Sequence, residues 1–265
     1  MRLLGRHAVV TGGGTGIGAA IARALAAEGA KLTLVGRRAE RLEAVASQLR
    51  APAKAGAQDN VRAGLLPSQE HVLVAPADVT SRAQVHRAFA SARETHGPID
   101  ILVNNAGAAQ GAPFAKVTHE LWRDMLAVNL DGMFHCCQAA LADLVAAERG
   151  RIVTIASMAG LYGFAYAAPY IAAKHGAVGL TRALAAEYAA TKLRANAVCP
   201  GFVDTDMTVE SVSNIAAKTG RSEDEARAEL ARLNPSGRLV SPEEVAATVL
   251  DLILSERNGE AVEIA

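Results

Sequence analysis

The sequence contains little cysteine, no net excess of charge and no long hydrophobic run. Its 265 residues include 3 cysteines, Cys136, Cys137 and Cys199, whose spacing suits no metal and whose odd number argues against a disulfide framework. Lys and Arg together number 27, as do Asp and Glu, so no basic excess favours nucleic acid or an anionic membrane. No stretch approaches the ~18 apolar residues of a membrane span, and the first residues do not resemble a targeting signal. We therefore expect a cytoplasmic protein that binds small molecules and has no metal, nucleic-acid or membrane partner.

Short apolar runs alternate with helical patterns along the chain. The runs expected to be strands cover residues 7–10, 31–35, 71–75, 99–103, 150–156 and 194–199. Six such alternations without an internal boundary predict an α/β fold, a Rossmann-type doubly wound parallel sheet flanked by helices in a single domain over 1–265. Residues 51–70 contain prolines and glycines among polar residues with no sustained period, which predicts an inserted loop.

The first predicted strand runs directly into a glycine-rich turn and then a helix. The turn reads Thr-Gly-Gly-Gly-Thr-Gly-Ile-Gly over residues 11–18, and the helical pattern starts at Ala19. Glycines permit positive φ and let the backbone approach a pyrophosphate, while free N–H groups at a helix N-terminus attract the anion. The pattern predicts a dinucleotide phosphate site formed by Gly12, Gly14, Thr15, Gly16, Ile17 and Gly18. The alternative is a tight turn with no ligand.

The second predicted strand is followed by Gly36, Arg37 and Arg38, where a dinucleotide fold meets the adenosine ribose. Many NAD sites place a carboxylate here for the 2′-hydroxyl, whereas guanidinium groups make forked hydrogen bonds to a 2′-phosphate. We therefore predict that NADP(H) is preferred over NAD(H). Thr15 adds no charge inside the glycine loop, so the preference is not expected to be absolute. The alternative is that the arginines lie in solvent.

Polar residues also follow the third and fourth predicted strands. Asp78 and Val79 are placed to meet a nucleotide base, and the fourth strand ends in Asn104, Asn105, Ala106 and Gly107 at the rim where open parallel sheets bind ligands. A helical pattern from about His119 to Ala147 then contains Asn129 in its middle. Because Asn is a poor residue in a helix interior, Asn129 is a candidate for a buried polar role. The alternative is an ordinary position on the helix surface.

The fifth predicted strand delivers Ser157 to the same rim, and a helix carrying Tyr170 and Lys174 follows. Pro169 suits the first turn of that helix, which we expect to continue through about Ala190. Tyr170 and Lys174 lie one turn apart on the same face. An ammonium at that distance favours the phenolate, so the pair predicts an acid/base whose pKa lies below the usual ~10. The alternative is a half-buried Tyr beside a solvated Lys.

Together these motifs resemble the short-chain dehydrogenase/reductase family over nearly the whole chain. Residues 11–18 are similar to the family's nucleotide loop and residues 104–107 to its central-strand motif. The family's catalytic tetrad matches, at the expected spacing, Asn129, Ser157, Tyr170 and Lys174. Residues 170–181 and 197–207 look most like reductases of 3-oxoacyl thioesters, which include acetoacetyl-CoA reductases and polyketide ketoreductases.

The resemblance implies an NAD(P)(H)-dependent oxidoreductase that interconverts a ketone and a secondary alcohol, with reduction of a 3-oxoacyl thioester to its 3-hydroxy compound as the expected reaction. It implies that Tyr170 transfers the proton on oxygen, that Ser157 hydrogen-bonds that oxygen, and that Asn129 positions a water that relays protons to Lys174. Lys174 is expected to depress the phenol's pKa and to hold the nicotinamide ribose. Besides the glycine loop and the two arginines, the expected cofactor contacts are Asp78, Val79, Asn105, Ala106, Gly107, Tyr170, Lys174, Pro200, Gly201, Val203 and Thr205.

The resemblance also places a substrate lid at residues 208–234. Arg221, Arg227 and Arg232 in that segment are candidates for contact with a CoA phosphate, the alternative being arginines in solvent. The family favours a homo-oligomer, a dimer or a tetramer. The Gly-Gly pair with which its members usually close is absent from residues 260–265, which weakens that expectation.

Three alternatives to a thioester reductase remain open. A dehydrogenase of a sugar, steroid or cyclic alcohol would use the same residues. An epimerase or dehydratase can use the same Tyr and Lys with tightly held NAD, but such relatives usually have longer chains and a different glycine spacing. A non-catalytic dinucleotide sensor would be expected to lack part of the tetrad, which is complete here.

Overall fold

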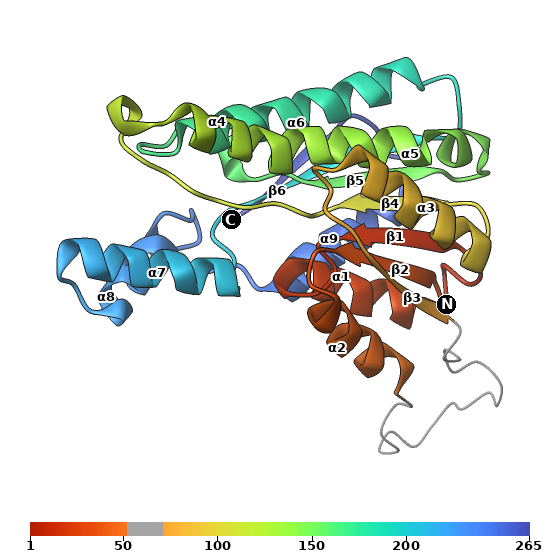
Figure 1. Ribbon diagram of the computed structural model, residues 1–265, viewed down its shortest axis with the longest axis horizontal. Coiled ribbons are helices and arrows are strands. Elements are labelled where there is room, and N and C mark those ends of the chain that lie inside the picture. The colour runs from red at the N-terminus through yellow and green to blue at the C-terminus, as the bar shows by residue number, and fades with distance from the viewer. Residues whose placement is uncertain (52–70) are drawn as a thin grey trace.

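The chain folds around one sheet of seven parallel strands (Figure 1). The structure is a computed structural model that describes residues 1–51 and 71–265, so the inserted loop predicted at 51–70 lies, from residue 52 on, outside the described residues. The strands are β1 (His7–Thr11), β2 (Lys31–Gly36), β3 (Val72–Pro76), β4 (Ile101–Asn104), β5 (Arg151–Ile155), β6 (Arg194–Pro200) and β7 (Ala261–Ile264). The six predicted strands are therefore confirmed, with ends shifted by one or two residues.

The order of strands across the sheet is β3-β2-β1-β4-β5-β6-β7. Connections run outward in opposite directions from the neighbouring strands β1 and β4, which confirms the predicted doubly wound sheet. In such sheets ligands bind beyond the carboxyl ends of the strands, where the direction of winding reverses. The edge strand β7 was not predicted. It pairs in parallel with residues 197–200 of β6 and is only partly buried, so its short sequence carries no periodic signal.

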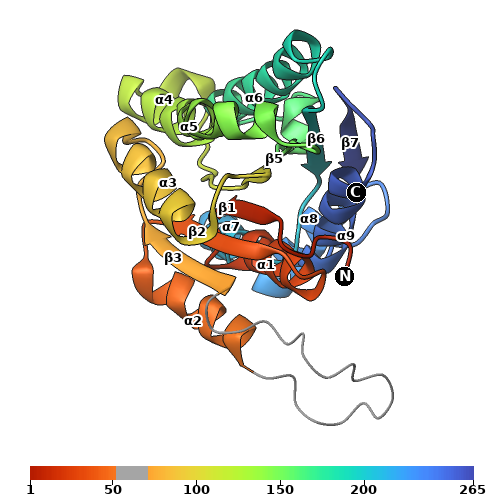
Figure 2. The same ribbon diagram turned by 90° about the vertical axis from the view of Figure 1, so that its right-hand side faces the viewer.

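Helices cover both faces of the sheet (Figure 2). One face carries α1 (Gly16–Ala27), α2 (Ala39–Arg50) and α9 (Pro242–Leu254). The other carries α3 (Arg82–His96), α5 (Gly132–Ala146) and α6 (Ala168–Glu187), with α4 (His119–Leu126) beside α6. Figure 1 shows α7 (Asp206–Thr219) and α8 (Glu223–Arg232) beyond the carboxyl ends of the strands, apart from both layers.

Successive side chains of the central strands point to alternate faces of the sheet and form a hydrophobic core on each face. In β4, Ile101 and Val103 enter the core under α1 and α9, whereas Leu102 enters the core under α3 and α5. In β2, Leu34 and Val35 divide in the same way. Successive side chains of a strand point to opposite faces, so strands covered on both faces need apolar residues at every position. This is why the central strands are continuous apolar runs in the sequence.

The helices that flank the predicted site begin and end close to their predicted bounds. α1 begins at Gly16 and not at Ala19, because the hydrogen bond from the Ala19 N–H to the Thr15 carbonyl (3.2 Å) already closes a helical turn over the last glycines. α6 carries Pro169 in its first turn, as predicted, and ends at Glu187 instead of about Ala190. Since α6 covers the sheet beside β5 and β6, it holds Tyr170 and Lys174 against the carboxyl ends of those strands.

Two buried histidines contact each other at the opposite end of the sheet, where β1 starts and α3 ends. The rings of His7 (1% exposed) and His96 (7% exposed) meet edge to face with centroids 5.2 Å apart. His7 Nδ1 donates to the Gly97 carbonyl (2.9 Å), the Thr33 hydroxyl donates to His7 Nε2 (3.0 Å), and His96 Nε2 donates to the Leu32 carbonyl (3.2 Å). Burial lowers the pKa of both rings, that of His96 to about 4. The folded protein therefore holds this pair neutral.

We predict that acid destabilises the protein through this pair. Well above a pH of ~6.5 both rings are neutral in the folded and unfolded states. As the pH falls toward 4, the histidines of the unfolded chain bind protons, whereas the buried pair in the folded protein stays neutral. The free energy of unfolding in urea should therefore fall between pH 7.5 and 5, by on the order of 1–2 kcal/mol for His96. His96→Gln should reduce that slope, whereas His86→Gln on the exposed face of the same helix should not. Equal slopes for the two variants would exclude this explanation.

Candidate active site

The glycine-rich turn packs tightly between β1 and α1. Gly12 and Gly16 have φ values of 66° and 48°, in the region that favours glycine. A Cβ on Gly18 would lie 2.1 Å from the carbonyl oxygen of Gly12, so only glycine allows α1 to approach the turn this closely. Thr15, which caps α1, makes no side-chain capping bond, and the first turn has no acidic residue. The N–H groups that begin α1 are therefore free of protein acceptors and accessible to an anion.

The end of β4 is tied to this turn. The Asn105 side chain donates to the carbonyl oxygens of Thr11 (3.0 Å) and Gly12 (3.1 Å). The backbone N–H groups of Asn105 and Ala106 both donate to the Thr11 hydroxyl at 3.0 Å. Asn105, which is predicted to contact a cofactor, lines the cavity described next, and its side-chain amide N–H groups also hold the glycine turn in place.

A cavity of about 260 Å³ lies where the carboxyl ends of β1, β2, β4 and β5 meet. It brings together most of the residues predicted to bind a cofactor or to act on a substrate. These are Gly12, Gly14, Thr15, Gly16, Ile17, Arg37, Arg38, Asp78, Val79, Asn105, Ala106, Gly107, Asn129, Tyr170, Lys174 and Thr205. The predicted residues thus come from segments far apart in the sequence and converge on one cavity.

The sequence analysis missed part of the lining, and some predicted residues lie outside it. The lining residues that were not predicted are Gly36, Arg41, Leu42, Ala77, Ala108, Val128, Ile155, Ala156, Asp206 and Met207. Most are small or apolar and carry no motif, although Arg41 follows Arg38 by one helical turn and that spacing could have indicated it. Gly18, Ser157, Pro200, Gly201 and Val203 do not line the cavity. Gly18 acts instead through its packing against Gly12.

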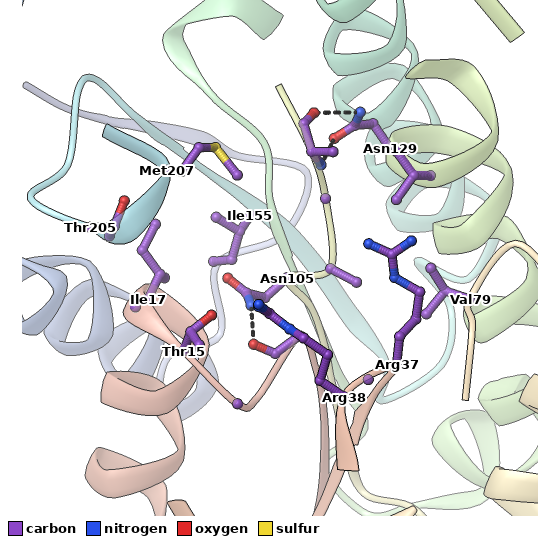
Figure 3. Close-up of a pocket in the computed structure, with 18 of the residues that line it drawn as sticks. Thr15, Ile17, Arg37, Arg38, Val79, Asn105, Asn129, Ile155, Thr205 and Met207 are labelled. Carbon is purple, nitrogen blue, oxygen red and sulfur yellow. Dashed lines mark hydrogen bonds between the residues drawn. The ribbon is translucent and has the colours of Figure 1, made fainter. Parts of the chain in front are cut away.

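Arginines gather at the end of the cavity formed by β2. Arg37 and Arg38 follow the strand, and Arg41 lies in the first turn of α2. In Figure 3 the side chains of Arg37 and Arg38 extend from the end of β2 toward the cavity. Among the described residues, no carboxylate lies within ion-pair distance of these three side chains. A Cβ on Gly36 would meet Leu42 at 3.4 Å, an ordinary contact.

Asn129 lies in a distortion of the helix and not in a regular helix interior. The single helix predicted from His119 to Ala147 is wrong, because a π-helical turn (Ala127–Asp131) separates α4 from α5. Asn129 is 3% exposed; its Nδ2 donates to the carbonyls of Ala108 (2.9 Å) and Met125 (3.0 Å), and its Oδ1 accepts from the Ala108 N–H (3.3 Å). Single π-turns recur at functional sites. The predicted buried polar position of Asn129 is therefore found.

Tyr170 and Lys174 face the cavity from α6. Lys174 Nζ donates to the Ile155 carbonyl at 2.9 Å and lies 5.7 Å from the centre of the Tyr170 ring. Burial lowers the pKa of Lys174 to about 8. Burial also raises the pKa of Tyr170, while the Ser157 hydroxyl opposes that shift. The prediction that Lys174 depresses the phenol's pKa is therefore wrong for this structure: its ammonium bonds to the backbone, and desolvation of the phenolate dominates.

Ser157 does not line the cavity but influences Tyr170, which does. It begins a short 3₁₀ turn (Met158–Gly160) at the end of β5, where its Oγ accepts the Ala159 N–H at 3.1 Å. A second, much smaller cavity of about 10 Å³ lies behind the first and is lined by Asn129 and Lys174. The side-chain oxygen of Asn104, which also lines it, is buried without a hydrogen-bond partner. This volume is close to the ~10–15 Å³ that one water molecule occupies.

The profile of the short chain dehydrogenase family matches residues 6–216. This chain belongs to that family. Its members bind NAD(P)(H), and the protein is an oxidoreductase that interconverts a ketone and a secondary alcohol. Among residues 1–51 and 71–265, no helix is both long and apolar enough to cross a membrane.

Individual relatives match along most of their length. The chain is 40% identical to "Granaticin polyketide synthase putative ketoacyl reductase 1" of Streptomyces violaceoruber, over 94% of this chain and 86% of that one. It is 38% identical to the galactitol 2-dehydrogenase (L-tagatose-forming) of Cereibacter sphaeroides, over 95% and 89%. The crystal structure of a variant of actinorhodin polyketide ketoreductase with NADPH superposes with a TM-score of 0.87 at 35% identity, covering 98% of this chain and 95% of that one.

The residues present fit a dinucleotide. Gly12, Gly14 and Gly16 leave one wall of the cavity without side chains, and the N-terminus of α1 opens onto it. At the β2 end lie arginines without an ion-pair partner among the described residues, and at the other end lie the buried Asn129 of the π-helical turn and Lys174 of α6. A phosphate group thus meets free backbone donors, and the reacting end of the cofactor meets groups that can hold a proton.

We predict that Gly18→Ala disrupts the glycine turn. Its Cβ would lie 2.1 Å from the Gly12 carbonyl and 2.5 Å from Asn105 Nδ2, so α1 must move away from the turn and from the end of β4. Overpacking of this kind costs roughly 1–3 kcal/mol, and cofactor affinity should fall with it. Gly179→Ala in α6 is the matched control, since a Cβ there meets nothing within 4 Å and should stabilise the helix slightly. Urea unfolding and cofactor titration measure both effects; a Gly18→Ala protein as stable as the control would refute the packing argument.

Proposed function

We propose that the protein reduces the 3-oxo group of an acyl thioester to a 3-hydroxy group with NADPH. The observation that carries this proposal is the convergence of Asn129, Tyr170 and Lys174 with the glycine turn and the arginines on one cavity. The substrate class is supported by the relatives named as polyketide ketoacyl reductases. The residue roles below follow from the same geometry.

In the proposed reaction Tyr170 donates its proton to the carbonyl oxygen of the substrate. Burial raises the pKa of this phenol, so it is held in its neutral, proton-carrying form at neutral pH, as a general acid for reduction requires. Ser157, whose hydroxyl opposes the rise in the pKa of Tyr170, would donate to the same oxygen and stabilise the negative charge that develops there. The bound reduced nicotinamide supplies the hydride. Lys174 then lies close enough to Tyr170 to hold the ribose beside it.

Asn129 and Lys174 line the smaller cavity, which we propose holds a water molecule. The unpartnered oxygen of Asn104 and the lysine ammonium would both bond to it. Lys174, with a pKa of about 8, can exchange a proton with such a water near neutral pH. This arrangement would resupply the proton that Tyr170 gives up in each turnover.

The substrate would enter under α7 and α8, which we propose act as the lid predicted at 208–234. Met207, in the first turn of α7, lines the cavity and is 42% exposed. Of the lid arginines, Arg221 forms an ion pair with Glu229, and Arg227 pairs with Asp204 at 2.7 Å. These pairs make the two side chains weaker candidates for a CoA phosphate than we expected.

A dimer or tetramer stays a prediction, for which the 43% exposed Phe134 on α5 offers an apolar contact.

A sugar alcohol is the second candidate substrate. The galactitol 2-dehydrogenase is almost as similar to this chain as the ketoacyl reductase, so overall identity does not separate the two. The partly exposed Met207 lines the cavity from α7 and favours an acyl chain over a polyol, because a polyol needs hydrogen-bond partners on every carbon.

We predict that acetoacetyl-CoA is reduced with a kcat/KM at least about tenfold above that for a hexulose such as tagatose, a difference of ~1.4 kcal/mol in transition-state binding. Oxidation of cofactor, followed at 340 nm, measures both. A cyclic diketone in the same panel tests a third class. A hexulose or cyclic ketone with the higher kcat/KM would reject the thioester proposal and leave the family assignment intact.

Tyr170→Phe should lower kcat by about 10²–10⁴-fold, because the variant keeps the ring and loses only the transferable proton. Its affinity for cofactor should stay near the wild-type value. Lys174→Ala should differ by weakening cofactor binding as well, since the same ammonium is proposed to hold the ribose. Fluorescence titration of cofactor and steady-state rates separate the two effects. Retention of more than about a tenth of wild-type kcat by Tyr170→Phe would remove Tyr170 from the proposed role.

NADPH should be preferred over NADH. Each charge-assisted hydrogen bond from Arg37 or Arg38 to a 2′-phosphate is worth ~1.5–3 kcal/mol, about 10–100-fold in affinity. Gly36→Asp combined with Arg37→Ile should invert or abolish the preference; Leu42 leaves room for the new Cβ. Arg87→Ile on the exposed face of α3 is the control. Specificity constants for both cofactors decide the matter, and a double variant with an unchanged ratio would mean that these arginines do not reach the phosphate.

A further inference from the structure

A buried asparagine closes the base of the segment that carries α7 and α8. Asn234 follows α8 and is 2% exposed. Its Oδ1 accepts the backbone N–H of Phe202 at 2.8 Å, and its Nδ2 donates to the carbonyls of Phe202 (2.9 Å) and Arg238 (2.6 Å). The amide thus pairs with both backbone groups of Phe202, as a neighbouring strand would, and joins the start of the segment to its end.

The asparagine fits only because position 201 has no side chain. A Cβ on Gly201 would lie 2.2 Å from Asn234 Oδ1 and 3.0 Å from the sulfur of Met158. Met158 follows Ser157 directly. Gly201 also donates its N–H to the Ile264 carbonyl at 2.8 Å, which ties this backbone to the end of β7. The backbone at Gly201 and Phe202, which Asn234 holds, therefore lies against the turn that carries Ser157.

Phe202 anchors the interior of the α7–α8 segment. Its side chain packs against a small apolar cluster that is separate from the cores on the two faces of the sheet and consists of Val212, Ala226 and Leu230, with Ile215 beside them. The residue whose backbone Asn234 holds is thus the residue on which α7 and α8 pack. Figure 1 shows these helices projecting beyond the carboxyl ends of the strands.

The chain beyond Phe202 leads directly to the cavity. The Val240 N–H donates to the Phe202 carbonyl and the Val240 carbonyl accepts the Asp204 N–H, both at 2.9 Å. The next residues, Thr205, Asp206 and Met207, line the cavity, and Thr205 lies 3.1 Å from the position of a Cβ on Gly16. A shift of Phe202 would therefore move the wall of the cavity that α7 provides.

We propose that Asn234 is a positioning residue that sets the placement of the α7–α8 lid and of the cavity wall at residues 205–207. This inference rests on the lid proposed above. The site requires one acceptor and two donors in one plane, which an amide provides. An aspartate would face two carbonyl oxygens with a carboxylate, and a leucine would leave the part-buried Phe202 N–H without its side-chain partner.

The test compares Asn234→Leu and Asn234→Asp with Asn214→Asp, a matched control on the exposed face of α7. Rates are measured with the best ketone of the wild-type enzyme, well below the melting temperature of each variant. Both Asn234 variants should lose at least about tenfold in kcat/KM for the ketone, the scale of one lost buried hydrogen-bond partner. Their Kd for cofactor should rise by a smaller factor than kcat/KM falls, because the ends of β2 and β4 do not touch Asn234 and only the wall at residues 205–207 moves with the lid. The control should match the wild type.

A merely structural role would lower the melting temperature and leave kcat/KM of the folded variant unchanged, which would overturn the proposal. Hydrogen exchange of the wild-type protein provides a measurement that needs no variant. The Phe202 N–H should exchange as slowly as the amides of β6, and exchange as fast as at the exposed ends of α7 would also overturn it. Turnover of a thioester by the wild type tests the proposed function separately, since the comparison between variants uses whichever ketone is reduced.

Discussion

The structure depends on the close approach between the glycine turn after β1 and the end of β4. Asn105 bonds to two carbonyls of the turn, and Gly18 leaves α1 free to pack on the Gly12 carbonyl. This contact lies where the winding of the sheet reverses, so it fixes the floor of the cavity. Once the turn is held, free N–H groups of α1 face the same space as the ends of β2, β4 and β5. The residues proposed to bind the cofactor and those proposed to transfer the proton are thereby placed side by side by one packing constraint.

Several groups around that space are held in arrangements that are unfavourable for stability alone. Lys174 is buried with a lowered pKa, Asn129 lies in a π-turn, and the side-chain oxygen of Asn104 has no partner. Each costs free energy in the folded protein, and all three lie within one small region behind Tyr170. Such clustering is typical of a functional site. Elsewhere among the described residues the buried Arg50 Nε also lacks a partner, whereas the fully buried Arg151 is satisfied by backbone carbonyls and Glu256.

The sequence was sufficient to predict six strands, the winding of the sheet and most residues of the cavity, because apolar runs and glycine turns are local signals. It did not reveal β7, whose partly exposed residues have no period, or the π-turn, which depends on the hydrogen bonds of Asn129 with Ala108. The sign of the Tyr170 pKa shift was also wrong. Spacing along a helix shows that Lys174 is near, but burial and the bond to Ile155 are properties of the folded chain.

The central claim is that one cavity brings the nicotinamide and the substrate carbonyl into direct contact beside Tyr170. Transfer of deuterium from the cofactor to the product tests this claim most directly. With NADPH carrying deuterium at the transferred position of C4, reduction of a ketone in ordinary water should place deuterium on the carbinol carbon of the product, as mass spectrometry would show. Product without deuterium, with the label released to water, would contradict a shared site and the account built on it.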